Sequence, residues 1–475
     1  MMRRQTKIVA TVGPACDQLA QLKDLVAAGV DVFRVNASHT SPDGLKRWIR
    51  LIRKTSHQVK KPVAVLVDLQ GPRIRTGRLA QGKMTLRKGD FVSILPGAVS
   101  GSGSVIATPC RVFARMVKPG DHILIDNGNL ELRVIKIAHR HVNCQVISGG
   151  ILGENKGINL PHAPDGFSAL TAKDRGDLEV ALEMGADYLA LSFVRTAKDI
   201  VRLKEWMRRM GKRVPVIAKI EKPGAFKEIE SILRVTDGIM VARGDLGIEM
   251  GVEKVPVAQK KMIELANYAG LPVITATQML ESMMEHPLPT RAEASDIANA
   301  VFDGTDAVML SGETAVGKYS REAVATMARV IVEAERYVGA KSGKCTVGTM
   351  HHKRLPVHAI AHAARDAACE IGAKAIVVYS RSGETAMLVS KLRPPAPIIA
   401  LAPSEEIRHR LVLYRNVLPM KISFQGNTDQ MLREGDRAIL AAGILKRGDC
   451  VVVVSGDQVL AGVRYAAKIH WMGNF

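Results

Sequence analysis

Short apolar runs recur along this chain, and the stretches between them have the polar and apolar spacing of helices. Each run is followed by polar or reactive residues. The eight runs are residues 7–11, 32–35, 63–67, 188–191, 214–218, 238–241, 273–276 and 306–310. Strands that alternate with helices eight times predict an α/β fold of the (β/α)8 TIM barrel type. The chemistry of such a barrel is expected at the carboxyl ends of its strands.

The barrel pattern breaks after the third run and resumes near residue 171. The break holds short β-like runs separated by turn signals such as Lys88-Gly89-Asp90 and Asp126-Asn127-Gly128. These runs are residues 84–86, 91–95, 122–125, 131–137 and 142–147. We therefore expect a small all-β, β-barrel-like lid domain over residues 72–164, inserted into a barrel formed by residues 1–71 and 165–340. The insertion follows a strand end, so the lid should lie on the reactive side of the barrel.

A second α/β unit is predicted over residues 353–475, after a polar linker at 341–352. Helices are expected at 357–371, 384–392, 405–413 and 429–442, and strands at 375–379, 398–401 and 449–455. This order predicts a mixed or mostly parallel sheet.

Length, hydrophobic content and cysteine spacing indicate the class of protein to which the chain belongs. The chain has 475 residues, of which 47% are hydrophobic, and this length predicts two or three domains. No apolar stretch is long enough to span a membrane, and the basic start runs straight into a strand without a cleavage site. The six cysteines are scattered singly, so we expect them to be reduced and mainly structural, in a cytoplasmic protein without a membrane partner.

The formal net charge of +21 allows two interpretations. One is nucleic-acid binding. The basic residues are dispersed, however, and aromatic residues make up only 4% of the chain, so no basic run is interleaved with stacking rings. A basic surface that attracts small polyanionic substrates is the preferred interpretation, without a nucleic-acid partner.

Charged residues at the ends of the fifth and sixth runs predict a cation site. A period of two places Lys219 and Glu221 on the same side of a strand. Asp245 follows the adjacent strand, so its carboxylate can converge with that of Glu221. Two carboxylates without His or Cys favour Mg²⁺ or Mn²⁺. The alternative is an internal Lys219–Glu221 salt bridge, with Asp245 capping the next turn.

Other strand ends carry groups for anions and protons. Arg34, Asn36 and Ser38 alternate by two, and Arg75 follows the third run; arginines here bind phosphate or carboxylate, or else form surface ion pairs. Hydroxyls and carboxylates at later strand ends can relay a proton through water or simply cap turns. These residues are Thr277, Gln278, Ser311 and Glu313.

A strand-to-helix loop in the second α/β unit contains Ser380, Ser382, Gly383 and Thr385. Hydroxyls and glycine at a helix amino terminus form an anion site, although the Walker A ending is absent. An ordinary capped helix is an equal alternative.

Long motifs give the chain a resemblance to the pyruvate kinase family over essentially its whole length. The matching segments are 10–15 (ATVGPA), 34–39 (RVNASH), 68–75 (DLQGPRIR), 156–161 (KGINLP), 218–222 (AKIEK), 240–247 (MVARGDLG), 276–283 (ATQMLESM) and 309–315 (MLSGETA). The resemblance implies transfer of the phosphoryl group of phosphoenolpyruvate to ADP, which gives pyruvate and ATP in glycolysis.

The resemblance also implies residue roles. Glu221 and Asp245 would hold Mg²⁺ or Mn²⁺, Lys219 and Arg34 would act on the phosphoryl group, and the backbone of Gly244 and Asp245 with Thr277 would hold the substrate carboxylate. Thr277, with water and with Ser311 and Glu313, would deliver the proton. The expected nucleotide contacts are Asn36, His39, Arg75 and, from the lid, Lys156, with Asp126 as a further lid candidate.

The monovalent-cation position departs from many family members. Those that need K⁺ hold it with residues that match Asn36, Ser38, Asp68 and the position of Leu69, where they carry Thr, and they carry Glu at the position of Arg73. The Arg73 guanidinium would replace the ion because two cations in one pocket repel. We expect K⁺ to be dispensable, and weak K⁺ binding is the competing possibility.

The resemblance further implies a homotetramer and allosteric control by a sugar phosphate or a nucleotide at Ser380, Ser382, Gly383 and Thr385. Glu384 would disfavour a phosphate there, and Arg381 would compensate in part. Two alternatives stay open from the residues alone: a Mg²⁺-dependent, enolate-forming barrel lyase, and a catalytically inactive phosphate-sensing or nucleic-acid-associated protein.

Overall fold

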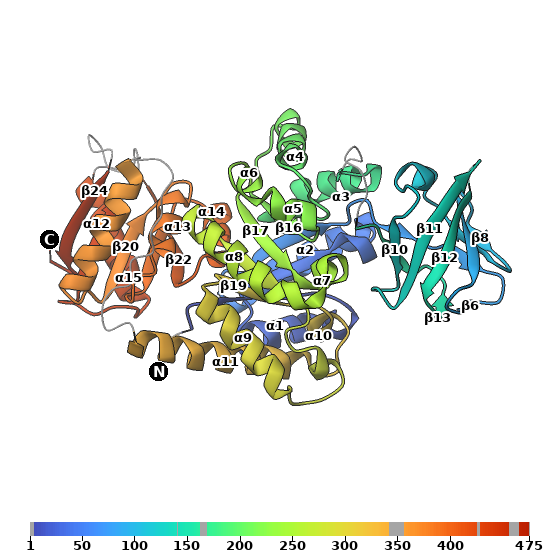
Figure 1. Cartoon of the computed structure of the whole chain (residues 1–475). Coiled ribbons are helices and arrows are strands. Elements are labelled where there is room, and N and C mark those ends of the chain that lie inside the picture. Colours follow the sequence, from blue (N-terminus) through green and yellow to red (C-terminus); the bar gives the residue numbers. More distant parts are fainter. Residues whose placement is uncertain are drawn as a thin grey trace.

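The computed structural model describes residues 4–139, 141–161, 169–341, 356–424, 428–455 and 465–474. Its three parts lie in a row (Figure 1), with the barrel in the middle, the β-rich insertion on one side and the carboxyl-terminal α/β part on the other. The exact boundaries 72, 164, 165, 340 and 353 remain predictions. Residues 164, 165 and 353 and most of the 341–352 linker lie outside the described part of the chain.

The central part is a closed barrel of eight parallel strands, and all eight predicted runs are strands of it. Around the barrel their order is β1-β19-β18-β17-β16-β15-β3-β2. Their bounds are β1 Lys7–Thr11, β2 Val32–Asn36, β3 Ala64–Leu69, β15 Tyr188–Leu191, β16 Val216–Ile220, β17 Gly238–Ala242, β18 Val273–Ala276 and β19 Ala307–Leu310. The predicted TIM barrel is confirmed.

Helices surround the barrel, and side-chain caps set where several of them begin. Thr171 and Thr290 each form a capping box with an acidic residue three positions on, and the Ser41 hydroxyl accepts from the Gly44 N–H. The helices are α1 Leu19–Ala28, α2 Pro42–Val59, α3 Ala172–Glu183, α4 Ala197–Arg209, α5 Pro223–Lys227, α6 Ile229–Leu233, α7 Arg243–Met250, α8 Val255–Tyr268, α9 Arg291–Asp303, α10 Gly312–Ala315 and α11 Ser320–Lys341. Short 3-10 turns are η1 Pro14–Cys16, η2 Ala37–His39, η4 Val252–Lys254 and η5 Glu281–Met284.

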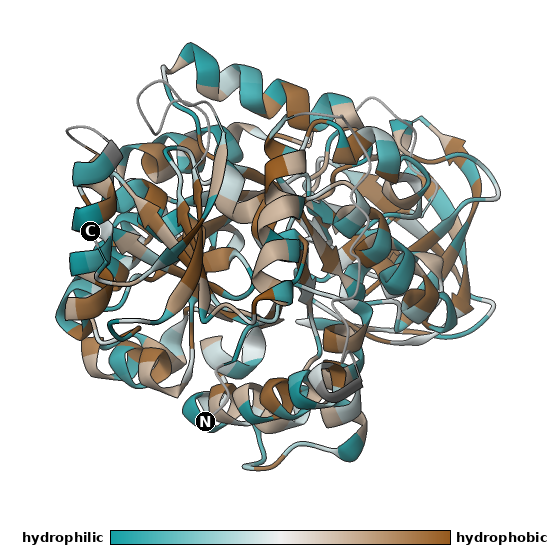
Figure 2. Ribbon diagram, turned by 90° about the vertical axis from the view of Figure 1, so that its left-hand side faces the viewer, coloured by the Kyte–Doolittle hydropathy of each residue, from teal (hydrophilic) through white to brown (hydrophobic). Residues whose placement is uncertain are grey.

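Hydrophobic side chains fill both layers of the barrel. One core lies between the strands and the helices, and a second lies inside the strands. Figure 2 shows the strongly hydrophobic residues gathered on the interior strands, while the outward helix faces are hydrophilic. Val412 and Leu413 of the carboxyl-terminal part join the inner core, so that part closes one end of the barrel.

The inserted part is all β, as expected. Its strands form a seven-stranded sheet, β4-β14-β10-β11-β12-β7-β9, and two small sheets, β13-β6 and β5-β8. The bounds are β4 Ile74–Arg75, β5 Arg78–Leu79, β6 Lys83–Leu86, β7 Phe91–Pro96, β8 Ser100–Gly101, β9 Val105–Thr108, η3 Phe113–Arg115, β10 His122–Ile125, β11 Leu130–Ala138, β12 His141–Ser148, β13 Gly150–Gly153 and β14 Gly157–Asn159. All five predicted β-like runs are strands, and the strands that were missed have only two to four residues.

The carboxyl-terminal part is a five-stranded sheet in the order β22-β21-β20-β23-β24, parallel except for β24. Its elements are α12 Pro356–Glu370, β20 Ala375–Tyr379, α13 Glu384–Lys391, β21 Ile398–Ala402, α14 Glu405–Arg410, η6 Leu411–Leu413, β22 Val417–Lys421, α15 Thr428–Ala441, β23 Cys450–Ser455 and β24 Ala466–Trp471. The α/β prediction is confirmed, but β22 and β24 were missed and the helix predicted at 405–413 ends in a 3-10 turn.

Two whole-chain expectations can be compared with this fold. None of the described helices is long and apolar enough to cross a membrane. The expectation that the cysteines are reduced is wrong for Cys369 in α12, which is disulfide-bonded, whereas Cys16, Cys110, Cys144 and Cys450 are free. Single, scattered cysteines carry no sequence signal for such a pair.

Candidate active site

Four buried charged side chains meet at the carboxyl ends of β2, β3 and β16. The Arg34 guanidinium contacts Asp68 Oδ2 at 2.6 Å, and Lys219 Nζ lies 3.3 Å from the same oxygen. Lys219 Nζ also lies 2.7 Å from Glu221 Oε1. Lys219 and Glu221 are therefore neighbours, as predicted. They form the internal salt bridge that was predicted as the alternative to a cation site.

Ser192 completes this network, and sequence reasoning missed its role. Lys219 Nζ donates to the Ser192 hydroxyl at 2.7 Å, and that hydroxyl donates to Asp68 Oδ1 at 3.1 Å. The next residue, Phe193, has a positive φ of 54°, and its N–H donates to Glu221 Oε2 at 2.7 Å. The available signal was the position of Ser192 directly after the fourth run.

The pKa values in the network follow from burial and from these charges. Burial alone would lower the pKa of Lys219, but Asp68 and Glu221 outweigh it and raise that pKa. Burial works against ionisation of Asp68, yet Lys219 and Arg34 hold its pKa below the ordinary value. Burial raises the pKa of Glu221, Lys219 opposes this, and the Asp245 carboxylate raises it again, so that the net direction is upward.

Glu221 and Asp245 have the donor chemistry that a hard divalent cation requires. Glu221 is 1% exposed, and repulsion from the Asp245 carboxylate contributes to its raised pKa. A divalent cation between them would relieve that repulsion. Among the described residues, no group of three or more His, Cys, Asp or Glu side chains forms a self-contained metal site. The two residues fit an ion whose remaining ligands are substrate oxygens and water.

The loops after β17 and β18 are locked together beside Asp245. The Gly244 N–H donates to Thr277 Oγ1 at 2.8 Å, and Arg243 donates to the Thr277 carbonyl at 2.6 Å. Thr277 and Gln278 both have positive φ values, 72° and 53°. A β-branched residue such as Thr277 is strained at positive φ. The contacts with Gly244 and Arg243 maintain this strain at the carboxyl ends of the barrel strands.

Ser311 and Glu313 lie where β19 ends. Glu313 is 2% exposed, and its two oxygens accept from the Leu280 N–H at 3.1 Å and the Ser311 N–H at 2.7 Å. These hydrogen bonds join the loop after β18 to the end of β19. They agree with turn capping, which was the alternative to a proton relay. A part in proton delivery remains a prediction for both residues.

The residues expected to contact the nucleotide come from β2, η2 and the lid. β4 and β14 pair so that Arg75 lies opposite Gly157, next to Lys156, whose Nζ contacts Asp126 at 2.9 Å. Burial lowers the pKa of His39, and the positive charges of Arg75 and Arg73 lower it further. Asn36 Oδ1 accepts from the Ser38 N–H at 3.1 Å. Asp126 orients Lys156.

The position expected for a monovalent cation already has partners. Asp68 Oδ2 contacts Arg34 and Lys219, and Asp68 Oδ1 accepts from Ser192. Leu69 is fully buried and apolar. Arg73 lines a cavity between the lid and the rim that also borders Asp245.

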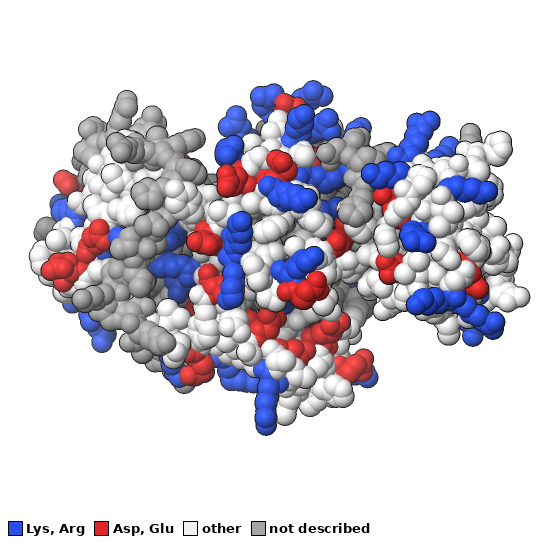
Figure 3. All heavy atoms as spheres, in the orientation of Figure 1, with Lys and Arg blue, Asp and Glu red and all other residues white. Residues whose placement is uncertain are grey.

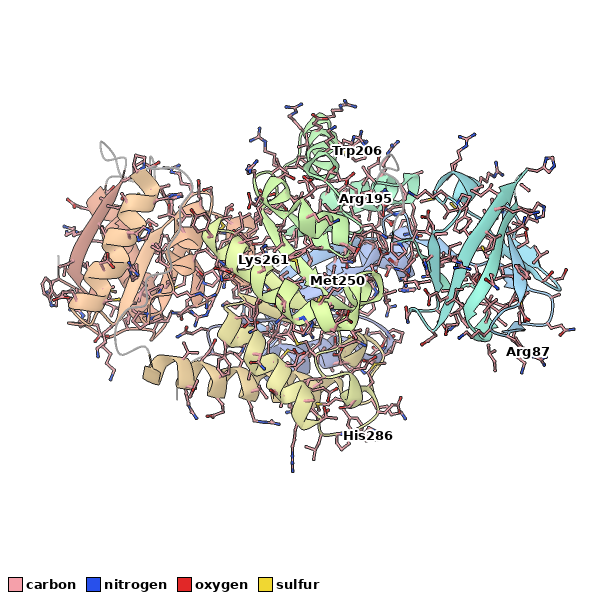
Figure 4. All side chains as sticks on the ribbon, in the orientation of Figure 1. Arg87, Arg195, Trp206, Met250, Lys261 and His286 are labelled. Atoms are coloured by element: carbon pink, nitrogen blue, oxygen red, sulfur yellow. The ribbon has the colours of Figure 1, made fainter. Side chains whose placement is uncertain are left out.

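This cavity reveals a second set of missed residues that tie the lid to the barrel. Lys222 forms an ion pair with Glu249 of α7, and Asn159 of β14 donates to the same Glu249 oxygen at 3.3 Å. Arg195, which follows β15, also lines the cavity and is labelled in Figure 4 near the lid side of the barrel. Lys222 directly follows Glu221, which was its only sequence signal.

The candidate effector loop is held by two of its own serine hydroxyls, and the N-cap residue of α13 is Gly383, which has no side-chain cap. The Gly383 N–H donates to Ser380 Oγ at 3.0 Å, and the Glu384 N–H donates to Ser382 Oγ at 3.3 Å. Ser380 and Thr385 are buried. The loop precedes α13 as expected, and its binding role remains a prediction.

Comparisons with known proteins agree along the chain. The family model described as "Pyruvate kinase, barrel domain" matches residues 3–324, and "Pyruvate kinase, alpha/beta domain" matches residues 358–470. A Mycobacterium tuberculosis pyruvate kinase is 43% identical over 455 residues, 96% of this chain and 95% of the relative. A Corynebacterium glutamicum pyruvate kinase is 40% identical over 474 residues, 100% of this chain and 98% of the relative. The crystal structure of a pyruvate kinase from Cryptosporidium parvum matches with a TM-score of 0.90 at 33% identity, and covers 99% of this chain and 96% of that one.

Proposed function

This chain belongs to the pyruvate kinase family, and on that premise we propose which of its residues carry out the family's reaction. It is a phosphotransferase that moves the phosphoryl group of phosphoenolpyruvate to ADP and forms pyruvate and ATP. Little covalent chemistry falls to the protein in such a transfer, because positioning and charge stabilisation carry most of the catalysis.

The observation that carries the proposal is the buried Lys219 ammonium between Asp68, Glu221 and Ser192. Lys219 stabilises the transferring phosphoryl group and the enolate that remains, and Arg34 binds the phosphoryl oxygens from the adjacent strand ends. Both cations are held by Asp68, so their positions are fixed before substrate arrives and little reorganisation is needed.

The pyruvate kinase family generally uses Mg²⁺. In this chain Glu221 and Asp245 would hold Mg²⁺ or Mn²⁺, which when bound neutralises charge on the substrate oxygens. The amino-terminal turn of α7, with Gly244 and Asp245, and the Thr277 hydroxyl hold the substrate carboxylate. Thr277, with water and with Ser311 and Glu313, delivers the proton to the enolate. On the lid side, Asn36, His39, Arg75 and Lys156 bind ADP, with Asp126 orienting Lys156.

We further propose that the enzyme forms a homotetramer in the cytoplasm and that the loop with Ser380, Ser382, Gly383 and Thr385 takes an anionic effector. Tetramers and allosteric control are typical of the pyruvate kinase family, and the position of this loop before α13 supports its binding role.

Product analysis by phosphorus NMR for ATP and by proton NMR for pyruvate tests the function. With phosphoenolpyruvate, ADP and Mg²⁺, we expect ATP and pyruvate in equal amounts. Pyruvate or another carbon product without ADP would indicate the lyase instead. No turnover, together with salt-sensitive binding to nucleic acid, would indicate the inactive protein.

K⁺ independence is a separate proposal. The Leu69 side chain cannot coordinate an ion, and the Arg73 guanidinium lies at the same rim. We expect turnover with Mg²⁺ to be equal within about twofold in K⁺ and in tetramethylammonium at the same ionic strength, because the Arg73 guanidinium replaces the ion. The matched variant Arg73→Glu with Leu69→Thr is expected to become K⁺-dependent. A wild-type enzyme active only with K⁺ would overturn the role of Arg73.

A further inference from the structure

A groove lies at the seam between the barrel and the carboxyl-terminal part, far from the reactive rim. We call it the seam groove. Its walls are the second half of α4, the segment that leads into β16, the segment that leads into β17, and Arg410 at the end of α14. Pro215 and Asp237 directly precede the amino ends of strands, so the groove lies at the end of the barrel opposite the catalytic ends. Its volume of about 630 Å³ is in the range of small-molecule sites, which is ~300–1,000 Å³.

The seam groove carries an excess of positive charge. Five cationic residues and two acidic residues line it. The cations are Lys204, Arg208, Lys212, Arg213 and Arg410, and the acids are Glu205 and Asp237. Figure 3 shows Lys and Arg gathered over α4 at the top of the molecule.

Most of this positive charge has no carboxylate partner. Lys204 pairs with Asp237 at 2.7 Å, and Asp237 also accepts from the Val216 N–H at 2.8 Å. Within the described residues, Arg208, Lys212 and Arg213 have no side-chain ion pair, and all three are exposed. Three unpaired cations along one wall attract an anion.

Arg410 supplies a fixed cation at the seam. Its side chain is 14% exposed, it pairs with Glu406 at 2.5 Å, and it donates to the Arg213 carbonyl at 3.1 Å. Its Nε is buried and, among the described residues, lacks a hydrogen-bond partner. An anion in the seam groove would offset part of the cost of this desolvated guanidinium.

The remaining wall of the seam groove is apolar. Met207 is 2% exposed, and Val214, Pro215 and Val235 are partly buried beside it. An apolar wall beside the cationic side chains of the seam groove fits a ligand with a flat apolar face and a phosphate. A bare inorganic ion would leave the apolar wall unused.

We propose that the seam groove binds a nucleoside monophosphate, with the base against Met207, Pro215 and Val235 and the phosphate against Arg208, Lys212 and Arg213. The Arg410 carbonyl accepts from the Tyr188 hydroxyl at 2.6 Å, and Tyr188 belongs to the inner barrel core with Leu413. A bound nucleotide therefore joins α4 to the segment that closes the barrel and favours the docked position of the carboxyl-terminal part.

Calorimetry on the full-length protein tests this proposal, with AMP as the probe and adenosine and inorganic phosphate as separate arms. The site variant is Arg208→Glu with Lys212→Glu and Arg213→Glu. The matched control is Lys83→Glu with Arg87→Glu and Lys88→Glu, which changes the net charge equally on the exposed lid, where Figure 4 labels Arg87. We expect the site variant to lose one AMP site per chain, or to bind there at least tenfold more weakly, while the control keeps it.

Neither adenosine nor inorganic phosphate is expected to match AMP. An unchanged number of AMP sites in the site variant, an equal loss in the control, or binding of adenosine as tight as that of AMP would overturn the proposal. Binding is read without turnover, so this test is independent of the proposed catalytic roles. The site variant should retain the basal rate with phosphoenolpyruvate and ADP.

Discussion

Lys219 lies among charges that explain both how it tolerates burial and how it can act. Isolated burial of an ammonium is costly, and Asp68, Glu221 and Ser192 offset that cost. The sequence predicted that Lys219 and Glu221 lie together, because they belong to one strand with a period of two. It did not predict that Asp68 joins Arg34 to Lys219, because contacts across strands depend on the register of three strands and on side-chain rotamers.

Replacing Glu221 by Gln tests the cation site. Gln keeps the shape but removes the negative charge, so the Mg²⁺ concentration for half-maximal turnover is expected to rise at least about tenfold. A Mg²⁺ titration of initial rates measures this. Glu230→Gln, an exposed change on α6, serves as the control. An unchanged Mg²⁺ dependence in Glu221→Gln would rule out the assignment.

Elements with strong patterning were predictable, and elements held by tertiary contacts were not. The barrel strands are mainly apolar and buried, whereas β22 contains Pro419 and β24 contains Lys468 and His470 within its six residues. The lid strands β4, β5 and β8 have two residues each, too few for any periodicity. Likewise the shared contact of Lys222 and Asn159 with Glu249 could not be predicted, because it exists only when the lid packs against the barrel.

Asp31, just before β2, links two barrel strands at their amino ends. Its carboxylate accepts from the Ile8 N–H of β1 at 3.0 Å and from Arg4 at 2.7 Å. Burial opposes its ionisation, but Arg4, Lys61 and Lys7 outweigh it and hold the pKa of Asp31 well below its usual range. A lowered pKa in the folded state means that the stabilisation is complete above the unfolded pKa, near 4, and is lost as the pH falls toward the folded value.

The Asp31→Asn variant is therefore expected to unfold more easily at pH 7, by about 1–3 kcal/mol in the free energy of unfolding. The difference from the wild type should shrink below about pH 4, where both forms lose the charge. Urea unfolding across this pH range measures it, with the exposed Asp24→Asn as the control. A difference that stays constant with pH would contradict the role of the charge.

At the scale of the whole molecule, the carboxyl-terminal part closes one end of the barrel. Val412 and Leu413 enter the inner core, and Lys391 of α13 reaches Asp306 at 2.6 Å and Asn267 at 2.5 Å. Lys391 and Asp306 are each 2% exposed. The sequence predicted both parts but not their contact, because Lys391 lies on a helix with ordinary polar spacing.

Lys391→Met removes the cation and leaves the buried Asp306 carboxylate without its ion-pair partner. Breaking a buried pair in this way typically costs about 3–5 kcal/mol. We expect denaturant unfolding to begin earlier and to separate into two steps, with the carboxyl-terminal part losing structure first. Lys374→Met, an exposed change in the same part, should leave the single transition unchanged. Wild-type unfolding of Lys391→Met would show that this ion pair does not hold the two parts together.

The most direct test of the catalytic account is the turnover of Lys219→Met with saturating phosphoenolpyruvate, ADP and Mg²⁺. The control is Lys260→Met, an exposed lysine paired with Asp303 on the outside of the barrel. Loss of the cation aimed at the phosphoryl group is expected to reduce kcat by at least about 10²–10³-fold, while thermal unfolding confirms a folded barrel. A folded Lys219→Met enzyme with turnover close to that of Lys260→Met would contradict the account.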